Sequence, residues 1–350
     1  MYDFELSKEI YSALSDEKSR QIYEKRCMLS LTNDVKYEDD IIFSVIDRKT
    51  LDKLIDYARE VSNKLVIRGT GNEFNTLIRL YPDLEYLFFV DRDPSRVEEG
   101  VFYGHQVVST EEFYESYDNY YVLICSSAFS SDIVSELREH GVTDDHILDF
   151  GGLWKTNQQY FDADIIRPIR HEVFVDGGCY DGTTARNFML WCNGEYDAIY
   201  SYEPDRKNYE KTLRMMEKES IERLKLFNKG LWDKRTTLYF NESGGQGSGI
   251  ISDNCATEEC ASIETATIDE TIRGGRATFI KLDVEGAEYE ALVGASETIA
   301  REHPRMAISV YHKPEDIFKL PSLIMEMSPN YKLFLRHYQM SRCETILYAL

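Results

Sequence analysis

The sequence predicts an α/β protein with two successive sheets covered by helices. The chain has 350 residues, more than one domain of ordinary size holds. Hydrophobic residues make up 43% of the chain, which is enough for large cores. Beyond residue 60, short apolar runs alternate with longer amphipathic stretches. Parallel strands joined by crossover helices have this pattern.

The N-terminal segment differs from the rest of the chain. It is polar and charged, and Leu51, Leu54, Ile55 and Ala58 are spaced to form one apolar stripe on a helix. We therefore expect a helical N-terminal extension over residues 1–60.

A first, smaller α/β domain is predicted over residues 61–155. Its apolar runs are Leu65–Ile67, Tyr86–Val90 and Tyr121–Ile124. Turn residues without clear periodicity follow between 151 and 168, so the domain boundary is expected there.

A second domain is predicted over residues 156–350. Its seven expected strands are 173–175, 198–200, 224–227, 279–282, 306–310, 332–335 and 345–348. Seven strands make one complete sheet. The Gly/Ser-rich stretch 243–249 is predicted to be a mobile loop, and the segment 241–262 is expected to help recognise a substrate.

Charge and composition argue against several classes of partner. Lys and Arg total 40 against 62 Asp and Glu, a formal net charge of −22 that repels a phosphate backbone. We expect no nucleic-acid partner. The N-terminus lacks the features of a secretory signal, and no run approaches the ~18 apolar residues of a membrane span, so we expect a cytoplasmic protein. Seven cysteines without a C-x-x-C pair indicate reduced thiols.

The strongest chemical signal follows the first strand of the second domain. Residues 176–184 read D-G-G-C-Y-D-G-T-T and precede a predicted helix that Thr183 can cap. The spacing D-x-G-x-x-x-G departs from the G-x-G-x-x-G that brings a pyrophosphate onto a helix N-terminus. S-adenosylmethionine, a nucleotide ligand without phosphates, suits this turn. The glycines allow close backbone approach, and Asp176 can hold the ammonium of the ligand.

Polar residues at the ends of later strands gather at the edge where open α/β sheets bind ligands. Glu203 is the predicted ribose ligand, the alternative being that Glu203 and Asp205 cap the next helix. Asp283 and Glu285 follow the fourth strand and His312 follows the fifth. His312, with an ordinary pKa near ~6.5, is predicted to accept a proton from a substrate hydroxyl. Helix caps, a hydrogen-bonded rim histidine, or a metal site of Asp283, Glu285 and His312 remain alternatives.

Five segments together resemble the FkbM family of S-adenosylmethionine-dependent methyltransferases. They are 175–184, 200–205, 228–233, 279–292 and 308–321. The resemblance runs from about residue 171 to residue 350. It implies the class I methyltransferase fold, a Rossmann-like seven-stranded sheet that is mostly parallel with one antiparallel strand near its end. It also implies an O-methyltransferase that acts on hydroxyls of sugars, polysaccharides or secondary metabolites.

The resemblance implies roles for individual residues. Cofactor binding is expected at Asp176, Gly177, Gly178, Cys179, Asp181, Gly182, Thr183, Glu203, Asn228 and Asp283. Catalysis is expected from His312, Asp283 and Glu285, and no metal ligand is included. Because the sulfonium already activates the methyl group, alignment of the acceptor oxygen should contribute more than a base.

The first domain looks like the Rossmann-like domains found ahead of sugar-modifying enzymes. Its loop 69–74 follows a strand and Asp91 ends the next one, which imitates a dinucleotide fingerprint with Phe74 in place of the third glycine. Two interpretations stay open. The domain binds a nucleotide-sugar or carrier, or it is a structural module that forms a homo-oligomer.

The leading prediction is an S-adenosylmethionine-dependent O-methyltransferase for a sugar or polysaccharide precursor. One rival is an NAD-dependent nucleotide-sugar-modifying enzyme centred on the first domain. Short-chain enzymes of that kind use a Tyr-x-x-x-Lys pair, and none of the 24 tyrosines here is followed by lysine four positions later. The other rival is a non-catalytic scaffold that binds the cofactor.

Overall fold

The computed structural model describes residues 4–154, 158–219, 221, 223–241, 250–251 and 260–350. The predicted mobile loop at 243–249 lies outside the described residues. The chain forms two compact units. Unit 1 comprises Met1–Asn33, Tyr160–Arg336 and Glu344–Leu350, and unit 2 comprises Asp34–Gln159 and His337–Cys343.

Unit 2 is built around a six-stranded sheet with the order β3-β4-β2-β1-β5-β6. The strands are β1 (Leu65–Arg68), β2 (Phe89–Asp91), β3 (Val101–Phe102), β4 (His105–Ser109), β5 (Tyr121–Ile124) and β6 (Ile147–Leu148). The α-helices are α3 (Val35–Val45), α4 (Arg48–Glu60), α5 (Asn72–Leu80), α6 (Pro94–Glu99), α7 (Thr110–Glu115) and α8 (Ser130–Glu139). Short 3-10 helices in the described part of this unit are η1 (Ser62–Lys64), η2 (Asp144–His146) and η3 (Gly151–Leu153). The pairs that β1 forms with β2 and β5 are parallel, as the apolar runs predicted.

Both faces of this sheet are buried. Leu65 and Ile67 of β1 belong to one apolar cluster, whereas Val66 between them belongs to another. Leu123 and Val122 of β5 divide in the same way. Because successive side chains of a strand point to opposite faces, helices cover the sheet on both sides.

Unit 1 contains a seven-stranded sheet with the order β16-β17-β15-β14-β7-β8-β9. The strands are β7 (Glu172–Gly177), β8 (Tyr196–Tyr202), β9 (Leu224–Phe227), β14 (Phe279–Leu282), β15 (Arg305–Ser309), β16 (Leu333–His337) and β17 (Thr345–Ala349). All seven coincide with the predicted strands to within a few residues, and β17 pairs antiparallel with β15. The predicted class I methyltransferase sheet is therefore confirmed.

A second, four-stranded sheet of unit 1 was not predicted. Its order is β10-β13-β11-β12, and its strands are β10 (Gly230–Leu231), β11 (Thr237–Asn241), β12 (Ile250–Ile251) and β13 (Cys260–Ala266). The α-helices of unit 1 are α1 (Phe4–Ala13), α2 (Glu17–Thr32), α9 (Thr183–Trp191), α10 (Arg206–Glu219), α11 (Ile268–Ile272), α12 (Glu288–Val293), α13 (Ser296–Glu302) and α14 (Asp316–Met327). Across the described part of the chain, no helix combines the length and apolar character needed to cross a membrane.

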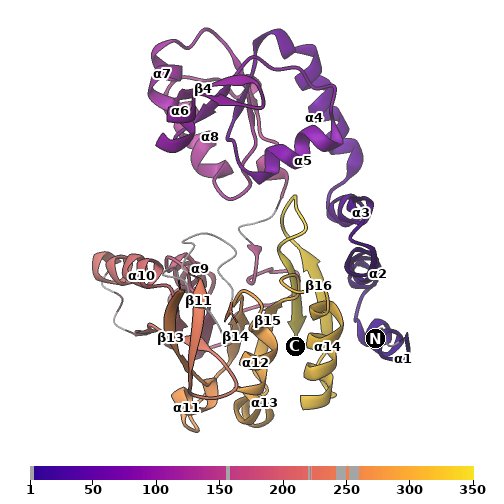
Figure 1. Cartoon of the computed structure of the whole chain (residues 1–350), viewed down its shortest axis with the longest axis vertical. Coiled ribbons are helices and arrows are strands. Elements are labelled where there is room, and N and C mark those ends of the chain that lie inside the picture. Colours follow the sequence, from indigo (N-terminus) through magenta and orange to yellow (C-terminus); the bar gives the residue numbers. More distant parts are fainter. Residues whose placement is uncertain (1–3, 155–157, 220, 222, 242–249, 252–259) are drawn as a thin grey trace. The chain divides into compact units, whose positions relative to one another are not determined.

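The N-terminal helices are shared between the two units. In unit 1, α1 and α2 lie beside α14 (Figure 1), and Leu14 forms a parallel bridge with Leu333. In unit 2, α4 buries Leu51 and Ile55 in the core. The compact units thus divide residues 1–60 between them, because the apolar faces of these helices pack on different cores.

The centre of the large sheet positions the candidate site. All six residues of β7 are buried, and β7 lies between β8 and β14. The chain runs outward through β8 and β9 on one side and through β14 and β15 on the other. The strand order therefore reverses at β7, and ligands of open α/β sheets bind beyond the carboxyl ends of the strands at such a point.

Candidate active site

The turn after β7 carries the predicted glycine motif. Gly178 has a φ of +76°, and a Cβ there would lie 1.9 Å from the main-chain oxygen of Asp283. Gly182 has a φ of +88°, and a Cβ there would lie 2.2 Å from Cε of Met215. Neighbouring segments of the chain itself therefore require glycine at both positions. Gly177, the last residue of β7, is also buried.

Asp176 lies beneath this turn, away from solvent. Its side chain is fully buried, and Oδ1 lies 3.3 Å from Nζ of Lys281, which is also buried. Lys281 Nζ donates hydrogen bonds to the main-chain oxygens of Gly177 at 2.9 Å and Gly178 at 2.6 Å. Burial raises the pKa of Asp176. Burial opposes the charge of Lys281, but attraction to Asp176 and Asp283 outweighs it and raises the pKa of Lys281. The carboxylate expected to hold the ammonium of the cofactor is thus already paired and anchors the turn.

Glu203 joins the end of β8 to the same turn. Its Oε2 accepts a hydrogen bond from the main-chain N–H of Tyr180 at 2.8 Å, and Oε1 accepts one from that of Asp205 at 2.9 Å. Burial raises the pKa of Glu203 to about 7, although both N–H groups act to lower it. Carboxylate oxygens have two acceptor sites each, so Glu203 keeps capacity for further donors. The capping alternative describes Asp205, whose Oδ1 accepts from the N–H of Asn208 in α10.

Asn228 supports the loop after β8. Its Nδ2 donates to the main-chain oxygens of Glu203 at 2.9 Å and Pro204 at 3.1 Å. The expected neighbour of the adenosine therefore fixes the backbone beside Glu203.

The start of α9 differs from the prediction. Thr183 was expected to cap this helix, but Gly182 occupies the N-cap position without a side-chain hydrogen bond, so that prediction is wrong. Asp181 Oδ1 accepts a hydrogen bond from the N–H of Thr183 at 3.0 Å, and Cys179 is fully buried. Tyr180, which has a positive φ of 53°, is 49% exposed and lies at the accessible side of the turn.

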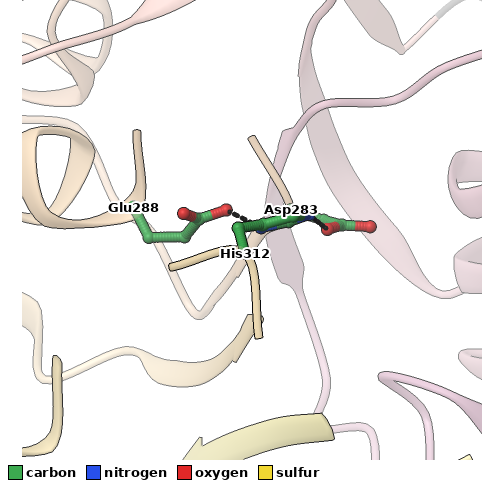
Figure 2. Close-up of side chains that lie close together, drawn as sticks. All are labelled: Asp283, Glu288 and His312. Carbon is green, nitrogen blue, oxygen red and sulfur yellow. Dashed lines mark hydrogen bonds and ion pairs between the residues drawn. The ribbon is translucent and has the colours of Figure 1, made fainter. Parts of the chain in front are cut away.

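Four ionisable side chains converge beyond β14 and β15. His312 Nδ1 lies 2.9 Å from Glu288 Oε1, while Nε2 lies 3.4 Å from Asp283 Oδ1 and 3.5 Å from Glu285 Oε2. Figure 2 shows the imidazole between Asp283 and Glu288. Glu288 is fully buried, whereas the Glu285 side chain is 40% exposed. The structure brings the predicted Asp283, Glu285 and His312 together and adds Glu288, which the sequence analysis missed.

Two tyrosines hold the carboxylate of Asp283. The Tyr160 hydroxyl donates to Oδ2 at 2.7 Å and the Tyr311 hydroxyl donates to Oδ1 at 3.1 Å. Neither tyrosine was predicted. Tyr160 lies outside every motif, 123 positions before Asp283. Glu288 did carry a signal, since the spacing D-x-E-x-x-E places a third carboxylate after β14.

These contacts change the protonation of His312. Burial lowers the pKa of His312, but the hydrogen bond and charge of Glu288, with the charges of Asp283 and Glu285, raise it to about 9. Burial raises the pKa of Asp283, but the charges of Lys281 and His312 more than offset it, so that pKa is lowered. Burial raises the pKa of Glu285. The pKa of His312 is therefore raised above the ordinary value expected from the sequence, and the imidazolium donates a hydrogen bond from Nδ1 to Glu288.

The dinucleotide-like motif of unit 2 is occupied by contacts within the chain. Asp91 Oδ2 accepts from the N–H and from the hydroxyl of Thr70, each at 2.8 Å. The Glu73 carboxylate, in the first turn of α5, accepts from the hydroxyl of Ser127 at 2.8 Å. Phe74, which replaces the third glycine, is fully buried in the apolar core.

Comparisons with known proteins agree with this architecture. Residues 176–342 match the protein-family model described as "Methyltransferase FkbM domain". A solved structure of methyltransferase FkbM from Methylobacillus flagellatus KT has a similar fold, with a TM-score of 0.50 and 20% sequence identity over 91% of this chain and 100% of that chain. Aeropyrum pernix fibrillarin in complex with S-adenosyl-L-methionine has a TM-score of 0.34 and 13% identity over 52% of this chain and 67% of that chain. No curated protein matches the chain.

Proposed function

We propose that the protein is an S-adenosylmethionine-dependent O-methyltransferase, since residues 176–342 match the family model of the methyltransferase FkbM domain. The proposed acceptor is a hydroxyl group of a sugar or polysaccharide precursor. The proposed cofactor site is the turn after β7 together with Glu203 and Asn228. The proposed acceptor site is the neighbouring edge at Asp283, Glu285 and His312.

One observation carries the cofactor assignment: the Glu203 carboxylate lies against the glycine turn with acceptor capacity to spare. Its Oε2 is 2.8 Å from the N–H of Tyr180 in that turn. A ribose beside the turn can donate its hydroxyls to Glu203.

The charge of the site agrees with this assignment. Asp283 and Glu285 lie at the neighbouring strand end, and carboxylates attract the sulfonium and ammonium groups of S-adenosylmethionine but repel phosphates. The residues present therefore fit a cationic nucleoside rather than a dinucleotide.

The chain has two chemical tasks in this proposal. Bound S-adenosylmethionine supplies a methyl group that its sulfonium already activates. The chain must hold the acceptor oxygen in line with that methyl group, which contributes most of the acceleration. Uptake of the hydroxyl proton falls to the carboxylate of Glu285, whose pKa is raised by burial, since His312 beside it is already protonated. In this proposal His312 forms ion pairs that orient the carboxylates of Asp283 and Glu285, a role that differs from the base predicted from the sequence.

The carbohydrate acceptor rests on the resemblance of the five motifs to FkbM enzymes. The rival NAD-dependent activity has weaker support, because Asp91 is already hydrogen-bonded to Thr70. In addition, the Glu73 carboxylate lies at the start of α5, where a pyrophosphate would bind.

Calorimetric titration of the full chain with S-adenosylmethionine and with NAD tests the proposal. We expect binding of S-adenosylmethionine and none of NAD; the reverse result would reject it. Glu203→Ala should weaken the binding of S-adenosylmethionine by about 1.5–3 kcal/mol, the usual contribution of hydrogen bonds to a charged group. Glu217→Ala, an exposed position on α10, is the matched control and should bind normally. Equal affinity in both variants would place the adenosine away from Glu203.

A further inference from the structure

The four ionisable groups beyond β14 and β15 are arranged more closely than alignment of an acceptor requires. The two nitrogens of His312 face different partners. Nδ1 is 2.9 Å from the buried Glu288, while Nε2 faces Asp283 at 3.4 Å and Glu285 at 3.5 Å. We propose that Asp283, Glu285 and His312 Nε2 bind one divalent cation of the Mn²⁺ type.

The ligand geometry supports this assignment. Asp283 and His312 belong, with Glu288, to a group of three residues whose ligand atoms all lie within 4.8 Å of one another, and Glu285 Oε2 lies 3.5 Å from Nε2 of the same imidazole. The distances of 3.4 and 3.5 Å from Nε2 to the carboxylates of Asp283 and Glu285 match the spacing between two ligands that each lie about 2.1 Å from a shared ion. One imidazole with two carboxylates suits ions that accept both nitrogen and oxygen.

Hydrogen bonds from neighbouring residues fix the orientation of these ligands. A histidine that binds a metal usually donates its other N–H to a carboxylate, and Glu288 is in that position at Nδ1. Glu288 is itself fixed by the N–H of Val284, which donates to Oε1 at 2.8 Å. Asp283 is fixed by the hydroxyls of Tyr160 and Tyr311. The orientation of two ligands is thus set before any ion binds.

The negative charge of the site also favours a cation. Asp283, Glu285 and Glu288 bring three carboxylates around one imidazole, and Glu288 Oε2 is buried without a hydrogen-bond partner among the described residues. The nearby ammonium of Lys281 is paired with Asp176 and hydrogen-bonded to the turn. At neutral pH the imidazolium of His312 offsets one of these charges. A divalent cation that displaces the Nε2 proton would offset two of them and leave less uncompensated charge at the site. The 40% exposed side chain of Glu285 leaves a path for the ion from solvent.

The role of the ion in the reaction rests on the proposed function. A divalent cation at this place would bind the oxygen of the acceptor and lower the pKa of its hydroxyl. The site itself is independent of the acceptor, so it is testable by binding alone.

The experiment titrates the full chain, freed of metal with a chelator, with Mn²⁺ and follows free Mn²⁺ by electron paramagnetic resonance. We expect one Mn²⁺ ion to bind per chain and excess Mg²⁺ to displace it. The spectrum of the bound ion should show coupling to an imidazole nitrogen, and His312→Gln should abolish this coupling. Asp283→Asn and Glu285→Gln should each lower the affinity at least about tenfold, and Glu288→Gln by about 10- to 100-fold. Glu217→Gln on α10 is the control and should bind as the unaltered chain does.

Two results would overturn the inference: no Mn²⁺ binding by the unaltered chain, or binding that Glu285→Gln and His312→Gln leave unchanged. Glu285 is partly exposed, so its variant should remain folded even where Asp283→Asn does not. S-adenosylmethionine is titrated into the same samples. Cofactor binding without Mn²⁺ binding would reject only the metal site, whereas Mn²⁺ binding without cofactor binding would reject only the proposed function.

Discussion

Lys281 shows how one buried charge organises the turn that we assign to the cofactor. Its ammonium contacts Asp176 and the main-chain oxygens of Gly177 and Gly178, and both charged side chains are excluded from water. In such a pair each charge depends on the other, because removing one leaves the second buried without compensation. A lysine within the apolar run Phe279–Leu282 was visible in the sequence, but its partner was not.

Lys281→Met is expected to lower the free energy of unfolding by about 3–5 kcal/mol, the usual cost of leaving a buried charge unpaired. Urea denaturation measures this loss. Adding Asp176→Asn should recover part of it, because the second charge is then removed. Lys218→Met, at an exposed position of α10, should change stability by less than about 0.5 kcal/mol. If Lys281→Met is as stable as its control, the ion pair does not hold the turn.

The sequence located some site residues and not others for a physical reason. Asp283, Glu285 and His312 each follow a predicted strand, so the rule that strand ends meet at one edge was enough to bring them together. Tyr160 approaches Asp283 from 123 positions away, and no local pattern reports such a contact. The raised pKa of His312 likewise depends on burial and on Glu288, which only the packed structure supplies.

Among the helices and strands, those that are buried on both sides were the ones that the sequence predicted correctly. The central strands of the large sheet, such as β7 and β14, are apolar runs because they are buried on both faces, and such runs are visible in sequence. The small sheet of β10 to β13 was missed: β10 has two residues, and β13 begins within the segment predicted as an irregular recognition loop. The packing of α1 and α2 was also not predicted, because an apolar stripe on a helix does not indicate which domain core the helix packs against.

The N-terminus of α2 gives a test at this scale. Asp16 Oδ1 accepts from the N–H of Ser19 at 2.8 Å, and Oδ2 lies 2.7 Å from Nη2 of Arg336. Asp16→Ala removes both interactions and should cost about 1–2 kcal/mol of unfolding free energy, measured in urea. Asp16→Asn should cost less, because asparagine caps helices as well as aspartate does. Equal losses in the two variants would mean that the cap contributes nothing.

The same residue predicts a dependence on pH. Burial raises the pKa of Asp16, but hydrogen bonds from Arg336 and Ser19 lower it from 3.8 to about 2. Since the pKa is lowered in the folded state, the stabilisation is present above pH 3.8 and is lost as the pH falls towards 2. The difference in unfolding free energy between the unaltered chain and Asp16→Asn should therefore shrink over that range. A difference that does not change with pH would contradict the assigned ion pair.

At the scale of the whole molecule, charge decides which partners can approach. The formal net charge is −22, so long-range repulsion opposes polyanions. We expect no binding of duplex RNA at micromolar concentration, measured by fluorescence anisotropy at low salt, where attraction would be strongest. A salt-sensitive complex with RNA would show that a local basic surface overrides the net charge.

Segments of unit 1 that pack together are translated far apart in time. Helices α1 and α2 pack against segments that are translated much later: the Ser19 hydroxyl accepts a hydrogen bond from the N–H of Leu335, 316 positions later, and β17 lies between β15 and β16. During translation α1 and α2 emerge with their apolar faces uncovered, while most of unit 2 is synthesised in one stretch of 34–159. Vectorial synthesis therefore favours early folding of unit 2, and closure of the unit that bears the candidate site must await β17.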